Sequence, residues 1–214
     1  MHIVITGAGR GIGHTLAEWY RSAGHDVTGT ARDGSEAVKL DVTQPEGVQT
    51  LSDYLDGRPV DLLVCNAGVY LDKGQALDGG YPADMWADSF AVNVTGVFLT
   101  VQALLPNLRA ADPGKIAIIS SQMASHTRAP GGSYIYRASK AAALNIGRNL
   151  ATELKPEGIP VGIYHPGWVQ TDMGGSTAEI TVDQAVQGLM ARFQSLNISS
   201  TGCFETWDGR DHPF

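Results

Sequence analysis

The sequence is short of cysteine and of positive charge. Its 214 residues include only two cysteines, and 15 lysine and arginine residues stand against 22 aspartate and glutamate residues, for a net charge of −7. Two cysteines do not make a disulfide framework in a chain of this length, so we expect free thiols and a cytoplasmic protein. The acidic balance argues against a broad nucleic-acid-binding surface, and we expect no nucleic-acid partner.

Long apolar runs, repeats and low-complexity tracts are also missing. No apolar run approaches the length that crosses a bilayer, and the N-terminus starts with a strand-like run, so we expect no membrane partner. None of the six histidines is paired with cysteine or another histidine at ligand spacing, so a metal site is not expected. With 43% hydrophobic and 17% charged residues, the composition is that of a soluble protein with one core, and we expect a single domain over residues 1–214.

What the sequence does contain is an alternation of apolar runs and helical patterns. The expected strands are residues 2–6, 27–30, 38–41, 61–66, 115–121, 161–165 and 202–207. The expected helices are residues 12–23, 44–56, 82–110, 133–155 and 181–196. Runs such as Ile116-Ala117-Ile118-Ile119 are apolar without alternation, which is typical of strands covered on both faces. This order predicts an α/β fold with a parallel sheet, right-handed crossovers and helices on both faces.

A glycine-rich turn joins the first expected strand to the first expected helix. Its residues are Thr6, Gly7, Gly9, Arg10, Gly11, Ile12 and Gly13. Glycines here permit a tight turn and let a pyrophosphate approach backbone N–H groups at the positive end of a helix. The position therefore predicts a dinucleotide site, and the alternative is a tight turn without a ligand.

The end of the second expected strand bears on which dinucleotide is bound. An acid about 20 residues after the glycine turn would bind the ribose 2′-hydroxyl of NAD, but Arg32 stands near that distance and the first acid is Asp33. Arginine suits two-point contact with a 2′-phosphate, and Arg10 could supply a second positive charge. We therefore expect NADP (NADPH), with NAD as the less favoured alternative in which Asp33 faces the ribose.

The expected helix 133–155 carries Tyr136 and Lys140, which lie one turn apart on one face. A fixed ammonium beside a phenol favours the phenolate and brings its pKa, about 10 in the free side chain, closer to neutral. Tyr136 would then act as a general acid or base. The alternative is an ordinary solvated helical face.

The glycine turn, the sequence Asn66-Ala67-Gly68 and Tyr136-x-x-x-Lys140 follow one another in an order that resembles the short-chain dehydrogenase/reductase family. The resemblance covers essentially the whole chain. It implies a single Rossmann domain with a doubly wound, seven-stranded parallel sheet, which holds both NADP and the catalytic site. It also implies hydride transfer between a nicotinamide and a small carbonyl or alcohol substrate. Beyond the glycine turn and Arg32, the matching cofactor-binding positions are Asp41, Val42, Asn66, Ala67, Gly68, Tyr136, Lys140, Pro166, Gly167, Val169 and Thr171.

By the same resemblance, four residues carry the chemistry. Tyr136 exchanges the proton, Lys140 lowers its pKa, Ser121 binds the substrate oxygen, and Asn93 holds a water on a proton path. Ser121 lies 15 residues before Tyr136, slightly more than is usual in the family, so residues 122–132 must absorb the difference. This loop, together with residues 70–81 and 174–180, is expected to be mobile or to cover the ligand.

Two other functions compete with a carbonyl reductase. Residues 172–175 and 208–214 resemble the C-factor-like and sniffer-like carbonyl reductase branch, and this makes a non-catalytic NADP-binding sensor worth considering. The four catalytic residues argue against it, because a sensor need not keep proton-transfer groups. An epimerase or dehydratase on the same scaffold ranks last, since the chain leaves little room for a large substrate domain. The resemblance also suggests a homo-dimer or homo-tetramer that pairs through helices 82–110 and 133–155.

Overall fold

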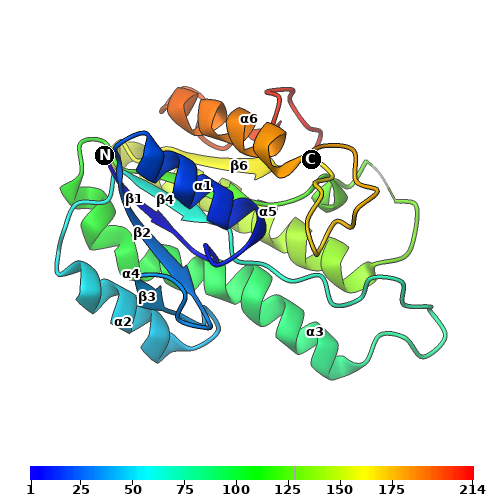
Figure 1. Ribbon diagram of the computed structural model, residues 1–214. Coiled ribbons are helices and arrows are strands. Elements are labelled where there is room, and N and C mark those ends of the chain that lie inside the picture. The colour runs from blue at the N-terminus through cyan, green and yellow to red at the C-terminus, as the bar shows by residue number, and fades with distance from the viewer. Residues whose placement is uncertain (128) are drawn as a thin grey trace.

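Seven parallel strands form one sheet at the centre of the protein, whose computed structural model describes residues 1–127 and 129–214. The strands are β1 (His2–Ile5), β2 (Asp26–Ala31), β3 (Val38–Lys39), β4 (Leu62–Cys65), β5 (Lys115–Ile119), β6 (Val161–His165) and β7 (Phe204–Thr206). Their order is β3-β2-β1-β4-β5-β6-β7, so the chain winds outward from β1 in one direction and from β4 in the other (Figure 1). Each neighbouring pair is parallel. The predicted doubly wound fold is confirmed.

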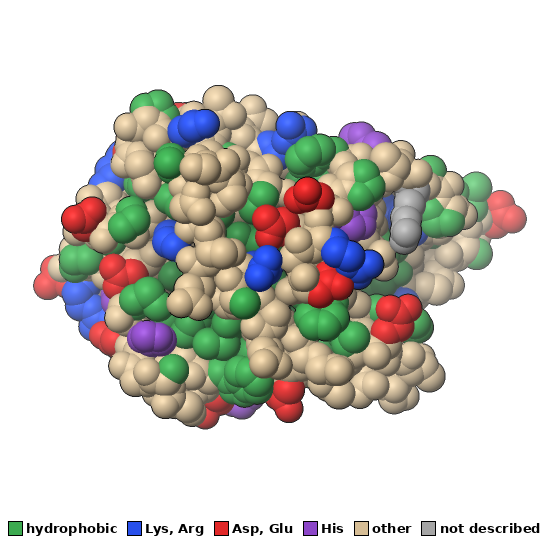
Figure 2. Space-filling model, turned by 90° about the horizontal axis from the view of Figure 1, so that it is seen from above, with side chains coloured by type: hydrophobic (Ala, Val, Ile, Leu, Met, Phe, Trp, Pro, Cys, Tyr) green, Lys and Arg blue, Asp and Glu red, His purple; other side chains and the backbone are tan. Residues whose placement is uncertain are grey.

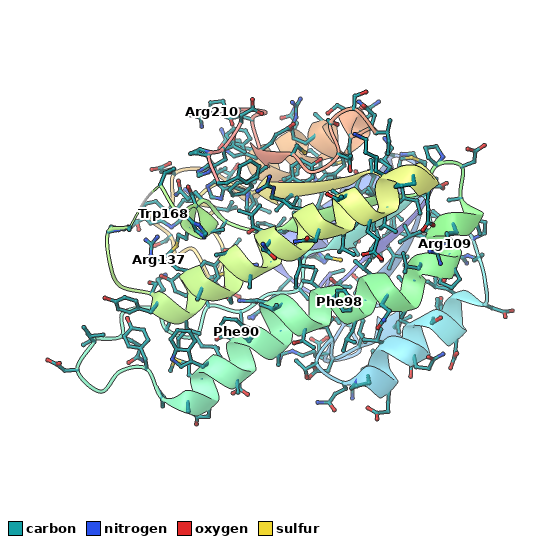
Figure 3. The ribbon with its side chains drawn as sticks, turned by 180° about the vertical axis from the view of Figure 1, so that it is seen from behind. Phe90, Phe98, Arg109, Arg137, Trp168 and Arg210 are labelled. Atoms are coloured by element: carbon teal, nitrogen blue, oxygen red, sulfur yellow. The ribbon has the colours of Figure 1, made fainter. Side chains whose placement is uncertain are left out.

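Helices cover both faces of this sheet. One face carries α1 (Gly11–Ser22) and α6 (Val182–Ser195), and the other carries α2 (Pro45–Leu55), α4 (Gly96–Ala110) and α5 (Tyr134–Leu154) (Figures 1 and 3). The remaining elements are α3 (Ala83–Phe90), the π turn η1 (Ala91–Thr95) and the short 3₁₀ turns η2 (Gln122–Ala124) and η3 (Lys155–Glu157). On the face that Figure 2 shows, with α6 toward the viewer, acidic and basic side chains are interspersed.

The apolar strands are explained by this double cover. Along β1, Val4 packs into the cluster beneath α2, α4 and α5, whereas Ile3 and Ile5 pack into the cluster beneath α1 and α6. Successive side chains of a strand point to opposite faces, and both faces here are dry. A run without polar alternation is therefore what a central strand of this sheet requires.

The expected helix 82–110 is interrupted where the sequence gives no warning. The structure forms α3, then the π turn η1, then α4, in one continuous helical stretch. A π turn adds a residue to the helical repeat and is often found at functional sites. Here it contains the buried Asn93. The edge strand β3 is also shorter than expected, because Asp41 belongs to a turn in which its carboxylate accepts the N–H of Thr43 at 3.0 Å.

The same stretch, Ala83–Ala110, corrects an expectation about apolar length. It runs for 28 residues with a mean hydropathy of 1.5 in its most apolar window, which is enough by length and composition to cross a membrane. This length is not visible as one apolar run, because polar residues such as Asn93 and Thr95 interrupt the stretch. A core helix of a soluble protein has the same properties, and Val101, Leu104 and Leu108 of α4 lie in the core.

Candidate active site

The predicted site residues gather at the carboxyl ends of the strands. The glycine turn follows β1, Asn66 follows β4, Ser121 follows β5 and Pro166 follows β6. The strand order reverses between β1 and β4, and ligands of open α/β sheets bind at such a point. The fold thus brings together segments that are far apart in the sequence.

Thr6 and Asn66 tie the ends of β1 and β4 to each other. The Thr6 hydroxyl accepts the backbone N–H groups of Asn66 at 3.1 Å and Ala67 at 3.2 Å. In return, the Asn66 side-chain amide donates to the carbonyls of Thr6 and Gly7, each at 3.0 Å. These bonds fix the start of the glycine turn relative to the end of β4.

The glycines of the turn are required by close approach and by backbone conformation. Gly7 has φ +68°, and a Cβ there would lie 2.9 Å from the Cα of Ala67. A Cβ on Gly13 would collide with the Gly7 carbonyl oxygen. Gly9 faces Ser35 of the loop after β2, and Gly11, at φ +55°, faces Thr171. A side chain at Gly7 or Gly13 would therefore push the turn away from β4 or from α1.

The start of α1 fits an anionic ligand. Arg10 occupies the N-cap in extended backbone, and its side chain makes no capping hydrogen bond. The first N–H groups of a helix need partners from outside the helix, and the positive end of its dipole favours a phosphate. Ile12 instead packs its side chain against the core. The residues present therefore fit the pyrophosphate of a dinucleotide.

The loop after β2 places Arg32 and Asp33 in solvent at the edge of this turn. The Asp33 carboxylate accepts the hydroxyl of Ser35 at 2.7 Å and its N–H at 3.1 Å, and these bonds hold the pKa of Asp33 below its usual value. Hydrogen bonds from Thr43, with a smaller contribution from the charge of Arg32, likewise lower the pKa of Asp41. Arg10 reaches across to Asp172 at 3.4 Å.

Val42, next to Asp41, is buried. A Cβ on Gly96 would lie 2.7 Å from Val42 Cγ2, so Val42 packs directly on the backbone of α4. Val42 thus packs on α4, and Asp41 is held in its own turn by Thr43. The cofactor contact of this pair stays a prediction.

Ser121, Tyr136 and Lys140 are brought together and are buried. Their exposed fractions are 7%, 8% and 5%. Ser121 lies close enough to the Tyr136 hydroxyl to lower the pKa of that phenol. Lys140 Nζ lies 5.8 Å from the centre of the Tyr136 ring and donates to the Ile119 carbonyl at 3.0 Å. The structure thus brings these three side chains together, and their catalytic roles stay a prediction.

The predicted effect of Lys140 on Tyr136 is not what the structure gives. Burial raises the pKa of Tyr136 to about 12, against a lowering by the hydrogen bond with Ser121, and the charges of Tyr70 and Asp72 raise it further. Burial also lowers the pKa of Lys140 to about 8. The expectation assumed a solvated pair, in which charge attraction decides the pKa. In this buried site the cost of dehydrating a charge is the largest cause for both groups, and it raises the pKa of Tyr136 and lowers that of Lys140.

Asn93 uses its side chain to join three segments. Its Oδ1 accepts the N–H of Val69, and its Nδ2 donates to the Val69 carbonyl and to Ser139 Oγ, all at 2.9 Å. A Cβ on Gly68 would lie 3.3 Å from both Asn93 Oδ1 and Lys140 Nζ, so Gly68 lets these groups approach. Asn93 thereby connects the end of β4 to α5, and its predicted role in holding water stays a prediction.

The longer spacing between Ser121 and Tyr136 is partly taken up by η2. Ser121 is the N-cap of this 3₁₀ turn, and its Oγ accepts the N–H of Met123 at 3.1 Å. The rest of the loop reaches α5 through Gly131 and Gly132, both with positive φ. Residue 128 of this loop lies outside the described residues.

The segment after β6 contains the predicted cofactor-binding residues Pro166, Gly167, Val169 and Thr171. Gly167, at φ +91°, lets Trp207 approach, since a Cβ there would lie 3.0 Å from its ring. Val169 is buried and pairs with Ile180, and Thr171 Oγ1 accepts the N–H of Gly174 at 3.1 Å. Beside the half-buried Pro166, a cavity of about 260 Å³ opens between β6, the 179–180 segment and the C-terminal segment. Figure 3 shows Trp168 at this end of the molecule.

One residue of the site was missed altogether. Asp72 is fully buried, and its carboxylate accepts the N–H groups of Ile135 and Tyr136. In the same loop, the Tyr70 ring stacks on the Tyr136 ring at 4.2 Å between centres. Nothing in the sequence marks Asp72, because an acid in a glycine-rich loop is usually exposed.

Comparison with known proteins agrees with this geometry. A family model described as short chain dehydrogenase matches residues 1–181. The C-signal protein of Myxococcus xanthus is 39% identical over 157 residues, which are 73% of this chain and 93% of that protein. The NADPH-bound carbonyl reductase from chicken fatty liver is 27% identical, with a TM-score of 0.90 over 100% of this chain and 98% of the other. Carbonyl reductase Sniffer of D. melanogaster, at 23% identity, has a TM-score of 0.92 over 100% and 99% of the two chains and shows the fold alone.

Proposed function

The chain belongs to the short-chain dehydrogenase family of oxidoreductases, and on that premise we propose that it uses NADPH to reduce a ketone or aldehyde to an alcohol. The observation that carries the proposal is the buried group of Ser121, Tyr136 and Lys140 beside a glycine turn that fits a dinucleotide. The NADPH-bound chicken carbonyl reductase, which shares this fold, supports it.

The residues divide between holding the cofactor and moving a proton. The glycine turn and the free N–H groups of α1 would hold the pyrophosphate, and Asn66-Ala67-Gly68, Pro166, Gly167 and Thr171 would line the nicotinamide side. NADPH, when bound, supplies the hydride. Ser121 fixes the substrate oxygen and stabilises the negative charge that develops there.

Tyr136 donates its proton to that oxygen. With a pKa raised to about 12, its hydroxyl is protonated at neutral pH. Reduction requires this protonated state, whereas oxidation requires the tyrosinate. Lys140 is still largely charged at pH 7, since its pKa is about 8, and its ammonium stabilises the tyrosinate left behind. We therefore propose reduction as the favoured direction at neutral pH.

NADPH rather than NADH is proposed because two arginines stand at the adenosine end. Arg32 is exposed beside the turn, and Oδ1 of the Asp33 carboxylate accepts two hydrogen bonds from Ser35. A ribose 2′-hydroxyl would have to share this carboxylate with Ser35, whereas a 2′-phosphate would find two exposed arginines, Arg32 and Arg10. The buried thiol of Cys65 and the unpaired Cys203 fit a reducing cytoplasm. Pairing of chains through α4, where Phe98 is exposed, is proposed as the route to a dimer (Figure 3).

The test is NADPH oxidation over a panel of aldehydes and ketones, with NADH in parallel, for the wild type and for Tyr136→Phe. We expect Tyr136→Phe to lose about 10²- to 10⁴-fold in kcat and to keep NADPH binding. Tyr134→Phe is the matched control, because Tyr134 lies on the same helix turn and is 40% exposed. NADPH binding without turnover of any substrate would favour the sensor alternative, to which the match with C-signal gives weight.

A further inference from the structure

The helix that carries Tyr136 starts without a cap of its own. Ser133 stands at the N-cap of α5 in left-handed backbone, with φ 48° and ψ 42°, and its side chain makes no capping hydrogen bond. It follows Gly131 and Gly132, which also have positive φ. Left-handed backbone is disfavoured for a residue with a side chain, so something outside the helix must hold this entry.

Asp72 supplies the missing cap from the loop after β4. Its Oδ2 accepts the N–H of Ile135 at 2.8 Å, and its Oδ1 accepts the N–H of Tyr136 at 3.2 Å. The carboxylate has no exposed surface. A buried carboxylate bound to the first N–H groups of a helix satisfies donors that would otherwise be unpaired and is stabilised by the helix dipole.

Tyr70, two residues earlier, holds the same helix end by two further contacts. Its hydroxyl shares a hydrogen bond of 2.5 Å with Ser133 Oγ. Its ring lies against the ring of Tyr136, tilted by 21°. The strained Ser133 and the backbone of Tyr136 are thus both tied to one short piece of the loop.

We propose that Asp72 is a positioning residue for Tyr136, which fixes the first turn of α5 so that the Tyr136 hydroxyl meets Ser121 and the substrate oxygen. This inference rests on the proposed function of Tyr136 as proton donor. It adds a residue that touches neither substrate nor cofactor and acts through two backbone N–H groups.

The charge of Asp72 has a second consequence for Tyr136. The groups that face this phenol are Tyr70 and Asp72 from the loop, Lys140 from its own helix and the Ser121 hydroxyl from the end of β5. Burial is the main reason that the pKa of Tyr136 is raised, and the negative charge of Asp72 adds to it. Asp72 therefore also helps to keep the proton on the donor.

The test compares Asp72→Asn with Asp78→Asn. The asparagine at 72 has the same shape but loses the charge and one of the two acceptors, whereas Asp78 is an exposed acid of the same loop. For Asp72→Asn we expect a roughly tenfold or greater fall in kcat with an unchanged KM for NADPH. The pKa of Tyr136, read from the pH dependence of its ring resonances by NMR, should fall, because the negative charge of Asp72 is one of the causes that raise it. Amide exchange of Ile135 and Tyr136, followed by NMR, should accelerate about tenfold or more. Asp78→Asn should match the wild type in all three.

Two outcomes would overturn the proposal. In the first, Asp72→Asn lowers the melting temperature but leaves kcat per folded molecule and the pKa of Tyr136 unchanged, so Asp72 serves stability alone. In the second, exchange of the two amides is unchanged, so the cap is not formed in solution. The exchange measurement needs no substrate, and it therefore separates failure of this proposal from failure of the proposed reductase activity.

Discussion

The two halves of the site are built in opposite ways. In the catalytic half, Ser121, Tyr136 and Lys140 are at most 8% exposed and are held by backbone groups such as the Ile119 carbonyl. In the cofactor half, the charged side chains lie in solvent: those of Arg10 and Asp172 are 74% and 82% exposed and stand 3.4 Å apart. The groups proposed to transfer the proton are thus fixed before any ligand binds, whereas the charged side chains proposed to select the cofactor lie in solvent.

Removing a hydroxyl from the buried half should have the largest effect. We expect Ser121→Ala to lower kcat by about 10²- to 10³-fold, because a fixed donor to the developing oxyanion is lost. The neighbouring Ser120 is as buried, but its hydroxyl donates to the Lys140 carbonyl at 3.1 Å. Ser120→Ala is therefore the control, and steady-state kinetics should show a far smaller loss. Equal losses in the two variants would mean that Ser121 acts only through packing.

The buried ammonium gives a prediction about stability and pH. Burial lowers the pKa of Lys140 from 10.5 to about 8, so between these pH values the unfolded chain binds more protons than the folded one. The cost of burying the charge is therefore complete below pH 8 and fades as the pH rises toward 10.5. We expect Lys140→Met to stabilise the fold more at pH 7 than at pH 10.5, by a difference on the order of 3 kcal/mol.

Denaturant unfolding of both proteins at the two pH values measures this. Lys155→Met is the matched control, since Lys155 is exposed just beyond the same helix. A stability difference between Lys140→Met and the wild type that does not change with pH would show that Lys140 is solvated in the folded protein.

The strands and the turn after β1 could be predicted from the sequence, whereas the burial of Tyr136 could not, for a physical reason. Glycine turns and strand periods are local patterns, and the structure has a turn and parallel strands where these patterns predict them. The protonation state of Tyr136 depends on how deeply the side chain is buried. The four-residue spacing of Tyr136 and Lys140 does not reveal that burial. Asp72 and Asp78 look alike in the sequence, yet one is fully buried beneath α5 and the other is exposed. Only the packing of two distant segments distinguishes them.

The exposed half should respond more gently to substitution. We expect Arg32→Ala to raise the KM for NADPH by about tenfold, the loss of roughly one charge-assisted contact, while the KM for NADH stays unchanged. Arg109→Ala removes an exposed arginine that pairs with Glu157 at 2.6 Å, far from the glycine turn in sequence, and serves as the control. An equal rise for both cofactors would place Arg32 on a part that NAD and NADP share.

The smallest effect is expected from Asp172. Asp172→Asn removes the partner of Arg10 in an ion pair that solvent screens on both sides. The KM for NADPH should fall by about twofold or less at low salt, because Arg10 is then free for the phosphate, and the difference should vanish at high salt. A tenfold change in either direction would mean that this pair gates the site and that the cofactor half is not loosely held.

The π turn at Ala91–Thr95 sets a limit on how this protein can change. One residue added to a regular helix turns everything beyond it by about 100°. Deleting a single residue here would keep the helix intact yet rotate Trp86 and Phe90 of α3 against the core contacts of α4, and it would remove Asn93 from Val69 and Ser139. A surface loop can gain or lose one residue without effect, but the same change in this helix would abolish the site. The helix can therefore accept substitutions, but it cannot accept insertions or deletions.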